Sequence, residues 1–429
     1  MEGFDGLDPG RNLEIVPTLV GGVTEERADF PAGELDGGGL EAEPGITVRW
    51  GFTPNLSLNA TLNPDFSQVE ADVAQLEINN QFALFFPEKR PFFLEGADFF
   101  DTRFDTVFTR NVLDPSWGVK LTGKAGANGL GVFLAEDEVT SLVFPGSQGS
   151  DGDTFDFETT DAALRYRRDF GRSSAIGAVF TGRQGGDYSS YLGGVDGLYR
   201  LGESDSINFQ LIASETEYPA DVAADFEQPA GTLSDSAFRF EYDRSARNWG
   251  AWFDYIDVGE DFRADLGFMP RVDYRQVIGG LRHRWWGDTD DWYNSWAIGG
   301  DYDITEDQTG LELERELELW WELSGPMQSY VFVDAGTRDR HFDGVDFDDQ
   351  RFIFSYAEFQ PTGDLYLELE WEAVEAIDFD NTRPGDQLTI SPEVRYNLGD
   401  HVRISLEHTL SRLDVEGGRL FEANLSQMR

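Results

Sequence analysis

The chain lacks cysteine, is poor in basic residues and has no long hydrophobic run. Without cysteine, its 429 residues contain no disulfide framework, thiolate nucleophile or cysteine-bound metal. Only 33 basic residues stand against 81 acidic ones, so the formal charge is −48 and nucleic acid is a poor partner. No apolar stretch reaches the roughly 18 residues of a transmembrane helix, so none is predicted.

The acidity has two interpretations, and both remain open. An acidic interior would concentrate cations near the protein. Alternatively, the charge is a halophilic adaptation, in which high salt screens the self-repulsion of the surface.

Residues 311–323 alternate strictly between two kinds of side chain. Because successive side chains of a β-strand point to opposite faces, this pattern predicts a strand with one apolar and one anionic face. The pattern recurs at residues 365–372 and, with more mixed polar residues, at 402–410. The apolar members of the first two ladders are Leu311, Leu313, Leu317, Leu319, Leu323, Leu365, Leu367, Leu369 and Trp371, and the acidic members are Glu312, Glu314, Glu316, Glu318, Glu322, Glu368, Glu370 and Glu372.

About 20 strand-like runs follow one another along the chain. Some connections are very short, at residues 171–172, 202–203 and 399–400, whereas those at 146–156, 218–235 and 339–349 are long and acidic. Short turns at one rim and long loops at the other are typical of up-and-down outer-membrane barrels. We therefore predict an all-β fold, a large antiparallel up-and-down transmembrane β-barrel of about 20 strands occupying residues 1–429, with lipid outside and charge inside.

Tryptophans gather near one predicted turn. Four of them bracket the sequence GDTDD, and Trp320 and Trp321 interrupt the first ladder. In a membrane barrel we expect these residues to lie in the aromatic girdle at the membrane interface.

The stretch 61–110 differs from the rest because its periodicity is lost. We predict that it lies inside the lumen or across its mouth as a plug-like segment. Its most promising residues are the charged side chains within aromatic clusters, namely Glu88, Lys89, Arg90, Glu95 and Asp98. They form either a ligand-binding network or a salt-bridge cluster that anchors the segment, and the sequence leaves both open.

The two carboxylate ladders also have two interpretations. The residues Glu312, Glu314, Glu316, Glu318, Glu368, Glu370 and Glu372 could line a cation-selective path or simply form a wetted strand face. A glycosidase pair of Glu88 with Glu95 or Asp98 cannot be established from spacing. The four histidines lack the spacing of zinc ligands, and we predict no metal site, no cofactor and no catalytic residue.

Three segments carry a resemblance to a known family. TLNPDFSQVEAD at residues 61–72, FFPEKRPFFLEGADFF at 85–100 and DPSWGVKLTGK at 114–124 resemble the DUF5916 family, and the resemblance runs over essentially the whole chain. It implies an outer-membrane barrel of a Gram-negative bacterium that usually follows a family 9 carbohydrate-binding-like domain. The family has no established function and supplies no catalytic residues.

The resemblance also bears on the ends of the chain. The first residues, MEGFDGLDPGR, show neither the basic nor the apolar region of a signal peptide. The carbohydrate-binding-like domain of the family is absent as well. We therefore expect a fragment truncated at both ends, with an incomplete barrel.

Three functional hypotheses follow. The first is an outer-membrane channel or surface uptake component for small polar or glycan-derived ligands. Its partner would be membrane lipid, and the sequence does not determine its oligomeric state. The second is a carbohydrate-active enzyme or glycan-binding surface module. The third is a structural membrane anchor for the missing N-terminal domain.

Overall fold

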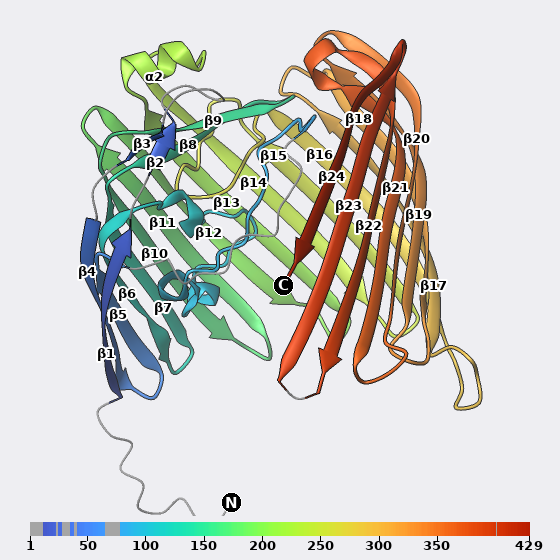
Figure 1. The fold of residues 1–429 in the computed structure, drawn as a ribbon, viewed down its shortest axis with the longest axis horizontal. Helices are drawn as coiled ribbons and strands as arrows, with labels where there is room; N and C mark the ends of the chain where they lie inside the picture. The colour runs from blue at the N-terminus through green and yellow to red at the C-terminus, as the bar shows by residue number, and fades with distance from the viewer. Residues whose placement is uncertain (1–11, 23–24, 28–34, 38–40, 65–77, 400) are drawn as a thin grey trace, which may run out of the picture.

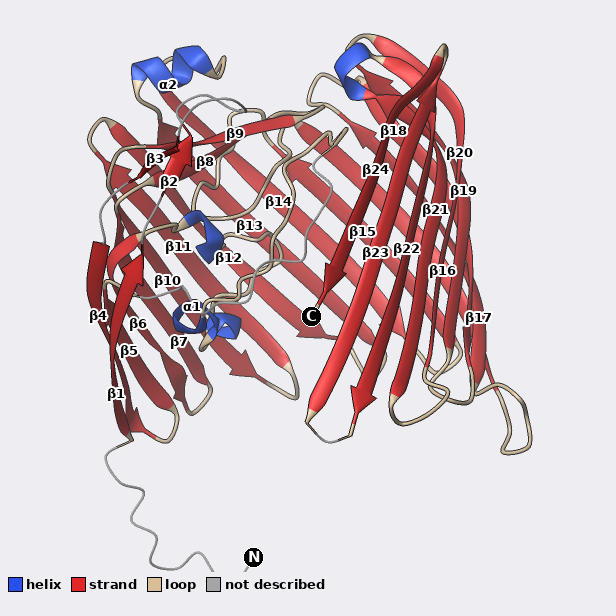
Figure 2. Cartoon of the chain, in the orientation of Figure 1, coloured by secondary structure: helices blue, strands red, loops and turns tan. Residues whose placement is uncertain are grey.

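The computed structural model describes residues 12–22, 25–27, 35–37, 41–64, 78–399 and 401–429 (Figure 1). A 20-stranded antiparallel sheet dominates it and curves around an interior (Figure 2). This confirms the predicted fold class, an all-β up-and-down barrel of about 20 strands. The short helix α1 (Pro91–Leu94) and neighbouring loops lie within the curve of the sheet, whereas α2 (Ala220–Asp225) lies at one rim.

The strands of the wall are mostly 10–16 residues long, enough for the roughly 9–11 residues of a membrane-spanning β-strand. They are β1 (Leu13–Gly22), β4 (Glu41–Thr53), β5 (Leu56–Leu62), β6 (Pro115–Ala125), β7 (Asn128–Asp137), β10 (Thr159–Phe170), β11 (Ser174–Gly185), β12 (Tyr188–Arg200), β13 (Asp205–Glu217), β14 (Thr232–Ser245), β15 (Trp249–Val258), β16 (Tyr274–Trp286), β17 (Ser295–Glu306), β18 (Glu312–Ser324), β19 (Tyr330–Phe342), β20 (Val345–Phe359), β21 (Leu365–Asp378), β22 (Arg383–Leu398), β23 (Val402–Val415) and β24 (Gly418–Met428).

The remaining elements are small. Two hairpins form separate two-stranded sheets that are not part of the wall. They pair β2 (Glu25–Arg27) with β3 (Leu35–Gly37) and β8 (Thr140–Pro145) with β9 (Ser150–Phe155). The helices are α1 (Pro91–Leu94), α2 (Ala220–Asp225) and the 3-10 turns η1 (Ala97–Phe99), η2 (Thr109–Asn111) and η3 (Phe379–Asn381).

Strand pairing follows the chain. It runs from β1 through β4, β5, β6 and β7 to β10, and then in sequence order to β24. Among the described residues, no register joins β24 to β1. The wall is therefore open between these two edges.

The two rims differ in the way predicted, except that residues 150–155 of the loop expected at 146–156 form strand β9, and strands replace the loop expected at 339–349. At one rim the strands reverse within a few residues, as between Phe170 and Ser174. At the other rim, longer connections follow β7, β13 and β15. The expected loop at 339–349 is wrong, because β19 and β20 continue through it to a two-residue turn. That turn is Asp343-Gly344, with positive φ at both residues, the geometry that an Asp-Gly hairpin turn favours.

The two faces of β18 carry opposite chemistry. Leu317 and Leu319 are 50% and 62% exposed, whereas the side chain of Glu316 is only 16% exposed. Leu281 of β16 and Ile298 of β17 are exposed on the same side as these leucines. The leucines therefore cover the outside of the wall, and the glutamates point to the other side.

The hydrophobic core lies on that other side, between the wall and two segments that fold inward. We call residues 78–114 the first inner segment and residues 259–273 the second inner segment. The apolar wall residues that pack against them come from strands β7 to β15. They are Phe133, Ala135, Ala163, Val179, Leu192, Ile212, Ala237, Ile256 and Val258. We call the face that carries them the inner face.

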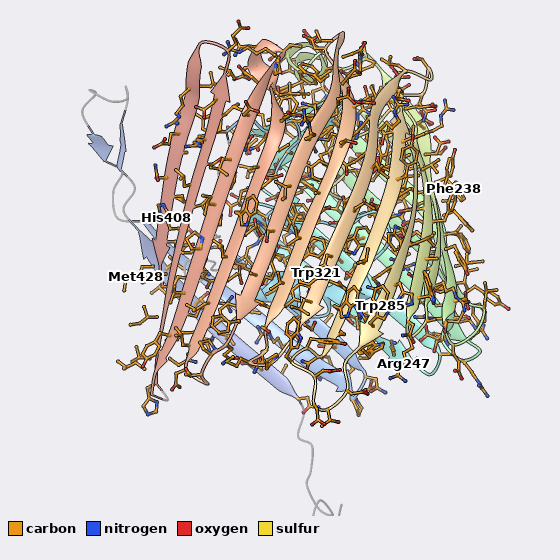
Figure 3. The ribbon with its side chains drawn as sticks, turned by 90° about the vertical axis from the view of Figure 1, so that its right-hand side faces the viewer. Phe238, Arg247, Trp285, Trp321, His408 and Met428 are labelled. Atoms are coloured by element: carbon orange, nitrogen blue, oxygen red, sulfur yellow. The ribbon has the colours of Figure 1, made fainter. Side chains whose placement is uncertain are left out.

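Tryptophans sort by face. On the outer face near the short-turn rim, Trp285 stacks on Trp296 with ring centroids 4.1 Å apart, and Trp321 lies opposite Ile298 (Figure 3). Trp320 lies on the inner face, because neighbouring residues of a strand point to opposite sides. The expectation that these tryptophans share one girdle is therefore wrong for Trp320, and also for Trp286, the neighbour of Trp285 in β16.

Candidate functional site

Arg90 is the centre of the first inner segment. Its guanidinium donates to the carbonyl oxygens of Val112 (2.7 Å) and Thr109 (2.6 Å) and forms an ion pair with Glu88 (2.7 Å). The guanidinium also lies 4.1 Å from the centroid of the Phe93 ring. Arg90 is buried, and these contacts tie the beginning of the segment to its end.

Glu88 completes this cluster. Its Oε1 accepts from the backbone N–H groups of Lys89 (3.0 Å) and Arg90 (2.9 Å), and its Oε2 accepts from the Thr109 hydroxyl (2.7 Å). Burial alone would raise the pKa of Glu88. The hydrogen bonds and the charge of Arg90 outweigh burial and hold the pKa below its usual value.

Two other predicted site residues, Glu95 and Asp98, follow this pair in the first inner segment. Glu95 forms an ion pair with Arg49 of β4 at 3.0 Å, and the Asp98 side chain is exposed in η1. Of the five predicted residues, the structure brings Glu88, Lys89 and Arg90 into direct contact, and it places Glu88, Glu95 and Asp98 near the ammonium of Lys120 in β6. Residues 65–77 of the predicted plug-like stretch lie outside the described residues.

Lys120 of β6, which sequence reasoning missed, fixes the first inner segment to the wall. Its ammonium is buried and donates to the carbonyl oxygens of Phe92 (2.6 Å) and Phe93 (2.8 Å). At the other end of the segment, Asn79 donates to the carbonyl oxygen of Ile377 in β21 (2.8 Å). The segment therefore crosses the interior from one part of the wall to another.

The second inner segment was also missed in the sequence. Its Asp265 accepts hydrogen bonds from the hydroxyls of Tyr188 (2.7 Å) and Tyr218 (3.2 Å), and burial raises its pKa. Arg183 of β11 is fully buried, pairs with Asp161 (2.9 Å) and donates to the carbonyl oxygen of Asp265 (3.2 Å). The only sequence signal was a loss of alternation in GEDFRADLGFMPRVD.

The two inner segments contact each other directly. The Phe108 N–H donates to the carbonyl oxygen of Leu266 (2.7 Å), and the Phe268 N–H donates to that of Asp105 (2.8 Å). The rings of Phe108 and Phe268 lie 5.2 Å apart. Together the segments form one packed unit against strands β7 to β15.

The β8–β9 hairpin adds a third layer at the long-loop rim. Val112 bridges to Thr140 in β8, and Gly146 bridges to Arg271 of the second inner segment. Gln148 at the hairpin turn accepts from the N–H of Asp343, in the turn between β19 and β20 (2.8 Å). The hairpin thus reaches from one part of this rim to another, as Figure 1 shows for β9.

The inner face continues from the packed strands to the acidic ones. Residues directly opposite each other in an antiparallel pair point to the same face. Asp254 shares a face with Ile256, which packs against Phe104 of the first inner segment. The row runs from Asp254 through Ile278 and Asp303 to Glu316 and Arg338. The glutamates of β18 therefore lie on the inner face.

We call the inward carboxylates of β17 to β19 the acidic wall. They are Asp301, Asp303, Glu314, Glu316, Glu318 and Asp334; Glu322, which pairs with Arg284, is not included. Asp301 lies directly opposite Glu318, and Asp303 lies opposite Glu316, an arrangement that costs stability because like charges repel. Arg338 offsets part of this repulsion, since its guanidinium lies 3.8 Å from Glu316.

The other predicted carboxylates have different surroundings. Glu312 lies beyond a register shift and pairs with Arg315 (3.2 Å). Glu368 accepts from the hydroxyls of Tyr356 (3.1 Å) and Tyr366 (2.5 Å). Glu370 lies exposed on β21 and Glu372 is half-buried, on the strand face that Glu368 also occupies.

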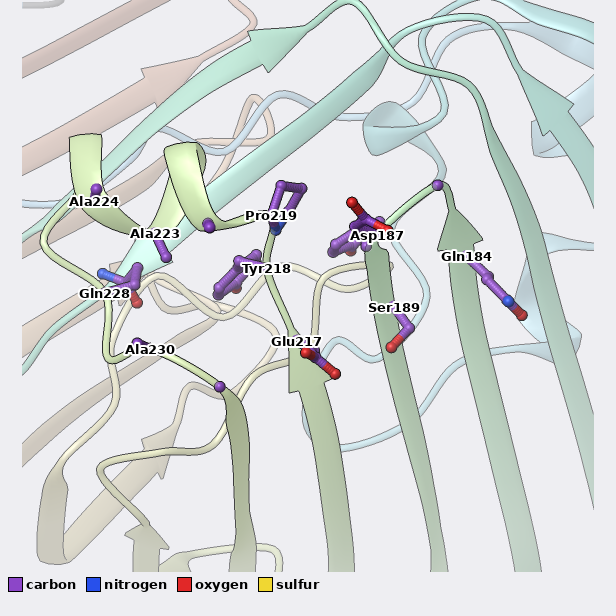
Figure 4. Close-up of a pocket in the computed structure, with 14 residues that line it drawn as sticks. Gln184, Asp187, Ser189, Glu217, Tyr218, Pro219, Ala223, Ala224, Gln228 and Ala230 are labelled. Carbon is purple, nitrogen blue, oxygen red and sulfur yellow. The ribbon is translucent and has the colours of Figure 1, made fainter.

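A cavity of about 600 Å³ opens at the long-loop rim beneath α2 (Figure 4). Asp187, Glu217, Gln184 and Gln228 contribute polar groups to its lining. Tyr188 and Tyr218 also line it, with nearly parallel rings 6.1 Å apart, but their hydroxyls already donate to Asp265.

Two features are absent from the described part of the chain. No helix there is both long and apolar enough to cross a membrane. Likewise, no group of three histidine, aspartate or glutamate side chains in those ranges has a geometry suited to a metal ion.

Comparisons with known proteins gave similar structures at low identity. Acinetobacter baumannii OccAB2 is 10% identical, with 73% of this chain and 90% of that chain covered and a TM-score of 0.42. Pseudomonas aeruginosa OpdQ is 10% identical, with 73% of this chain and 91% of that chain covered and a TM-score of 0.44. OpdO of the same species is 12% identical, with 75% of this chain and 92% of that chain covered and a TM-score of 0.42. With TM-scores below 0.5, these similarities carry no functional inference.

A family comparison was more specific. No curated protein matches the sequence significantly. The family model described as "Domain of unknown function (DUF5916)" matches residues 31–115, a shorter stretch than the resemblance traced in the sequence. The matched range contains the first two motifs, the first inner segment and the Glu88–Arg90 cluster. Residues 31–115 thus match the DUF5916 family, as the sequence motifs indicated.

Proposed function

We propose that this protein is an outer-membrane β-barrel of a Gram-negative bacterium that admits small polar solutes through its interior. The observation that carries the proposal is the inverted distribution of side chains across the wall. Leucines such as Leu319 are exposed on the outside, and carboxylates such as Glu318 lie on the inner face. A soluble barrel would bury its leucines and expose its charges, whereas a membrane barrel does the opposite.

The outer tryptophans support a membrane location. Trp285, Trp296 and Trp321 lie on the outer face at one rim, where a membrane barrel carries an aromatic girdle.

The uneven filling of the interior supports a passage. The inner segments pack against strands β7 to β15, and their hydrophobic clusters draw on no inner residue of β17 to β20 among the described residues. We propose that the segments act as a plug-like filling on one side, and that solutes pass along the acidic wall on the other. Arg271 of the second inner segment lies near Glu314 and Asp303, where the two sides meet.

Conductance of the full-length protein in a planar bilayer tests this proposal. We expect cation-selective conductance, because carboxylates along a path attract cations. Replacing Glu314, Glu316 and Glu318 together by glutamine should shift the reversal potential toward no selectivity. Glu215→Gln removes one carboxylate from the exposed outer end of β13 and should change nothing.

Three outcomes separate the hypotheses. Absence of conductance, both in the intact protein and after deletion of residues 81–110, would refute the channel and favour an anchor. Conductance that appears only after the deletion would support a plug. Hydrolysis of a glycan panel, lost in Glu88→Gln, would favour an enzyme instead.

A further inference from the structure

Two tryptophans form an aromatic platform on the inner face of β15 to β18. Trp252 of β15 and Trp320 of β18 approach each other across the two strands between them, with ring centroids 5.5 Å apart and planes inclined by 34°. Both rings are half-buried. The outer tryptophan cluster contains neither of them, so the girdle does not explain their position.

Glycines make the platform possible. A Cβ atom at Gly280 of β16 would lie 2.0 Å from Cζ2 of Trp252, and one at Gly299 of β17 would lie 2.3 Å from Cζ2 of Trp320. Since any side chain there would collide with a ring, the two glycines let the indoles lie flat against the wall. Residues from four strands thus build one surface.

Three carboxylates of the acidic wall lie beside this platform. Asp301 and Glu318 continue the row of Trp252 and Gly280 across the sheet. Asp334 lies directly opposite Trp320, shares a side-chain hydrogen bond with Glu318 and lies near Asp301. Among the described residues, no basic group lies within 4.0 Å of these three carboxylates.

Asp334 supplies an independent sign of a missing partner. Asp334 is only 8% exposed, and its buried Oδ1 has no hydrogen-bond partner. A buried carboxylate oxygen without a partner costs free energy, unless a ligand or a cation satisfies it. The neighbouring carboxylates are neutralised differently, Glu316 by Arg338 and Glu322 by Arg284.

We propose that Trp252, Trp320, Asp301, Glu318 and Asp334 bind a small organic cation, an amine or a quaternary ammonium. Indole faces attract such cations, and the carboxylates supply the opposing charge. A cation would also relieve the repulsion between Asp301 and Glu318, which a neutral sugar would not. The proposal rests on the proposed function, because a solute reaches the inner face only through the barrel interior.

Choline binding to the full-length protein in detergent micelles tests the site. We expect saturable quenching of tryptophan fluorescence and a saturable calorimetric signal, both measured against sodium chloride at equal ionic strength. Glu318→Gln and Asp334→Asn should each weaken choline binding about tenfold. Trp320→Leu should abolish the quenching and weaken the calorimetric affinity.

Matched variants keep the result specific. Glu370→Gln removes a carboxylate from β21, away from the platform, and should leave choline affinity unchanged. Arg282→Gln should strengthen binding, because Arg282 lies opposite Gly299, at the edge of the site. Gly299→Ala should weaken binding by displacing the Trp320 ring, without changing any charge.

The outcomes distinguish this inference from the proposed function. Choline binding without conductance would keep the site and refute the channel. Conductance without saturable choline binding would refute the site alone. Equal binding of maltose, unaffected by Glu318→Gln, would also overturn the inference, since it would show a neutral sugar platform.

Discussion

Two parts of the same wall present different kinds of side chain to the interior. Strands β7 to β15 present residues such as Phe133 and Val179 inward and bury them under the inner segments. Strands β17 to β19 present Asp303, Glu316 and Asp334 inward instead. Both parts share strand geometry and an exposed apolar outside.

The difference shows that the polarity of the inward side chains depends on whether a chain segment packs against them. Where the chain folds back into the interior, many inward positions are apolar, and buried charges there form ion pairs such as Arg183 with Asp161. Where the hydrophobic clusters of those segments do not extend, inward positions include carboxylates that lie opposite each other. The variants below test whether the packed part is structural and the acidic part is not.

The largest effect is expected from Arg183→Met in the packed part. The substitution leaves Asp161 buried without its partner, which should lower the free energy of unfolding by about 3–5 kcal/mol. The midpoint of urea unfolding in detergent micelles measures the loss. Arg351→Met, at a residue whose side chain is 76% exposed, should stay within about 0.5 kcal/mol. Equal losses of stability in the two variants would show that the buried Arg183 is no more important for stability than an exposed arginine.

A glycine between the two inner segments should come next. A Cβ at Gly267 would lie 2.2 Å from the carbonyl oxygen of Asp105, so Gly267→Ala must push the segments apart. We expect a loss of about 1–3 kcal/mol in the same unfolding measurement. Gly279→Ala is the control, because no atom lies within 4 Å of its added Cβ. A neutral Gly267→Ala would show that the contact is not tight.

Acid should loosen the first inner segment. The pKa of Glu88 is lowered in the folded protein, so its stabilising contribution is complete above its ordinary value near 4.5 and is lost as the pH falls through the folded value. The protection factors of residues 88–112 against hydrogen exchange, which correct for the intrinsic pH dependence of exchange, should therefore fall below pH 4.5. Glu88→Gln should remove that pH dependence, and a pH dependence that survives in this variant would assign it to another group.

The smallest effect, with opposite sign, is expected on the acidic wall. Glu318→Gln removes repulsion with Asp301 and should raise the free energy of unfolding by about 0.2–1 kcal/mol. Glu393→Gln provides the contrast, since Glu393 accepts from Arg395 (2.6 Å) and Ser405 (2.8 Å) and its neutralisation should destabilise. Destabilisation by Glu318→Gln would mean that the hydrogen bond between Glu318 and Asp334 outweighs the repulsion from Asp301.

Much of the fold could be predicted because a strand repeats every two residues. The alternation of Leu317 and Leu319 with Glu316 and Glu318 separates the two faces without knowledge of any contact. The same rule fails locally at 339–349, where the many aspartates suggested a loop. Cross-strand pairing extends β19 and β20 through them to the Asp343-Gly344 turn.

The candidate site was predictable only in part. The charges around Glu88 stood out because they interrupt aromatic clusters, and the ladder glutamates stood out by their spacing. Arg183, Lys120 and the Trp252–Trp320 platform did not, since each acts through partners far away in sequence. The separation of Trp320 from Trp321 needed only the alternation rule, applied one residue at a time.

The sequence by itself determined that the chain forms long two-faced strands, with leucine on one side and carboxylate on the other, because side-chain direction in a strand is a local property. Only the tertiary structure decided which inward faces are covered, which carboxylates meet a cation and where two indoles come together. Those outcomes depend on register and on chain segments that cross the interior, and neither is encoded within any single stretch of residues.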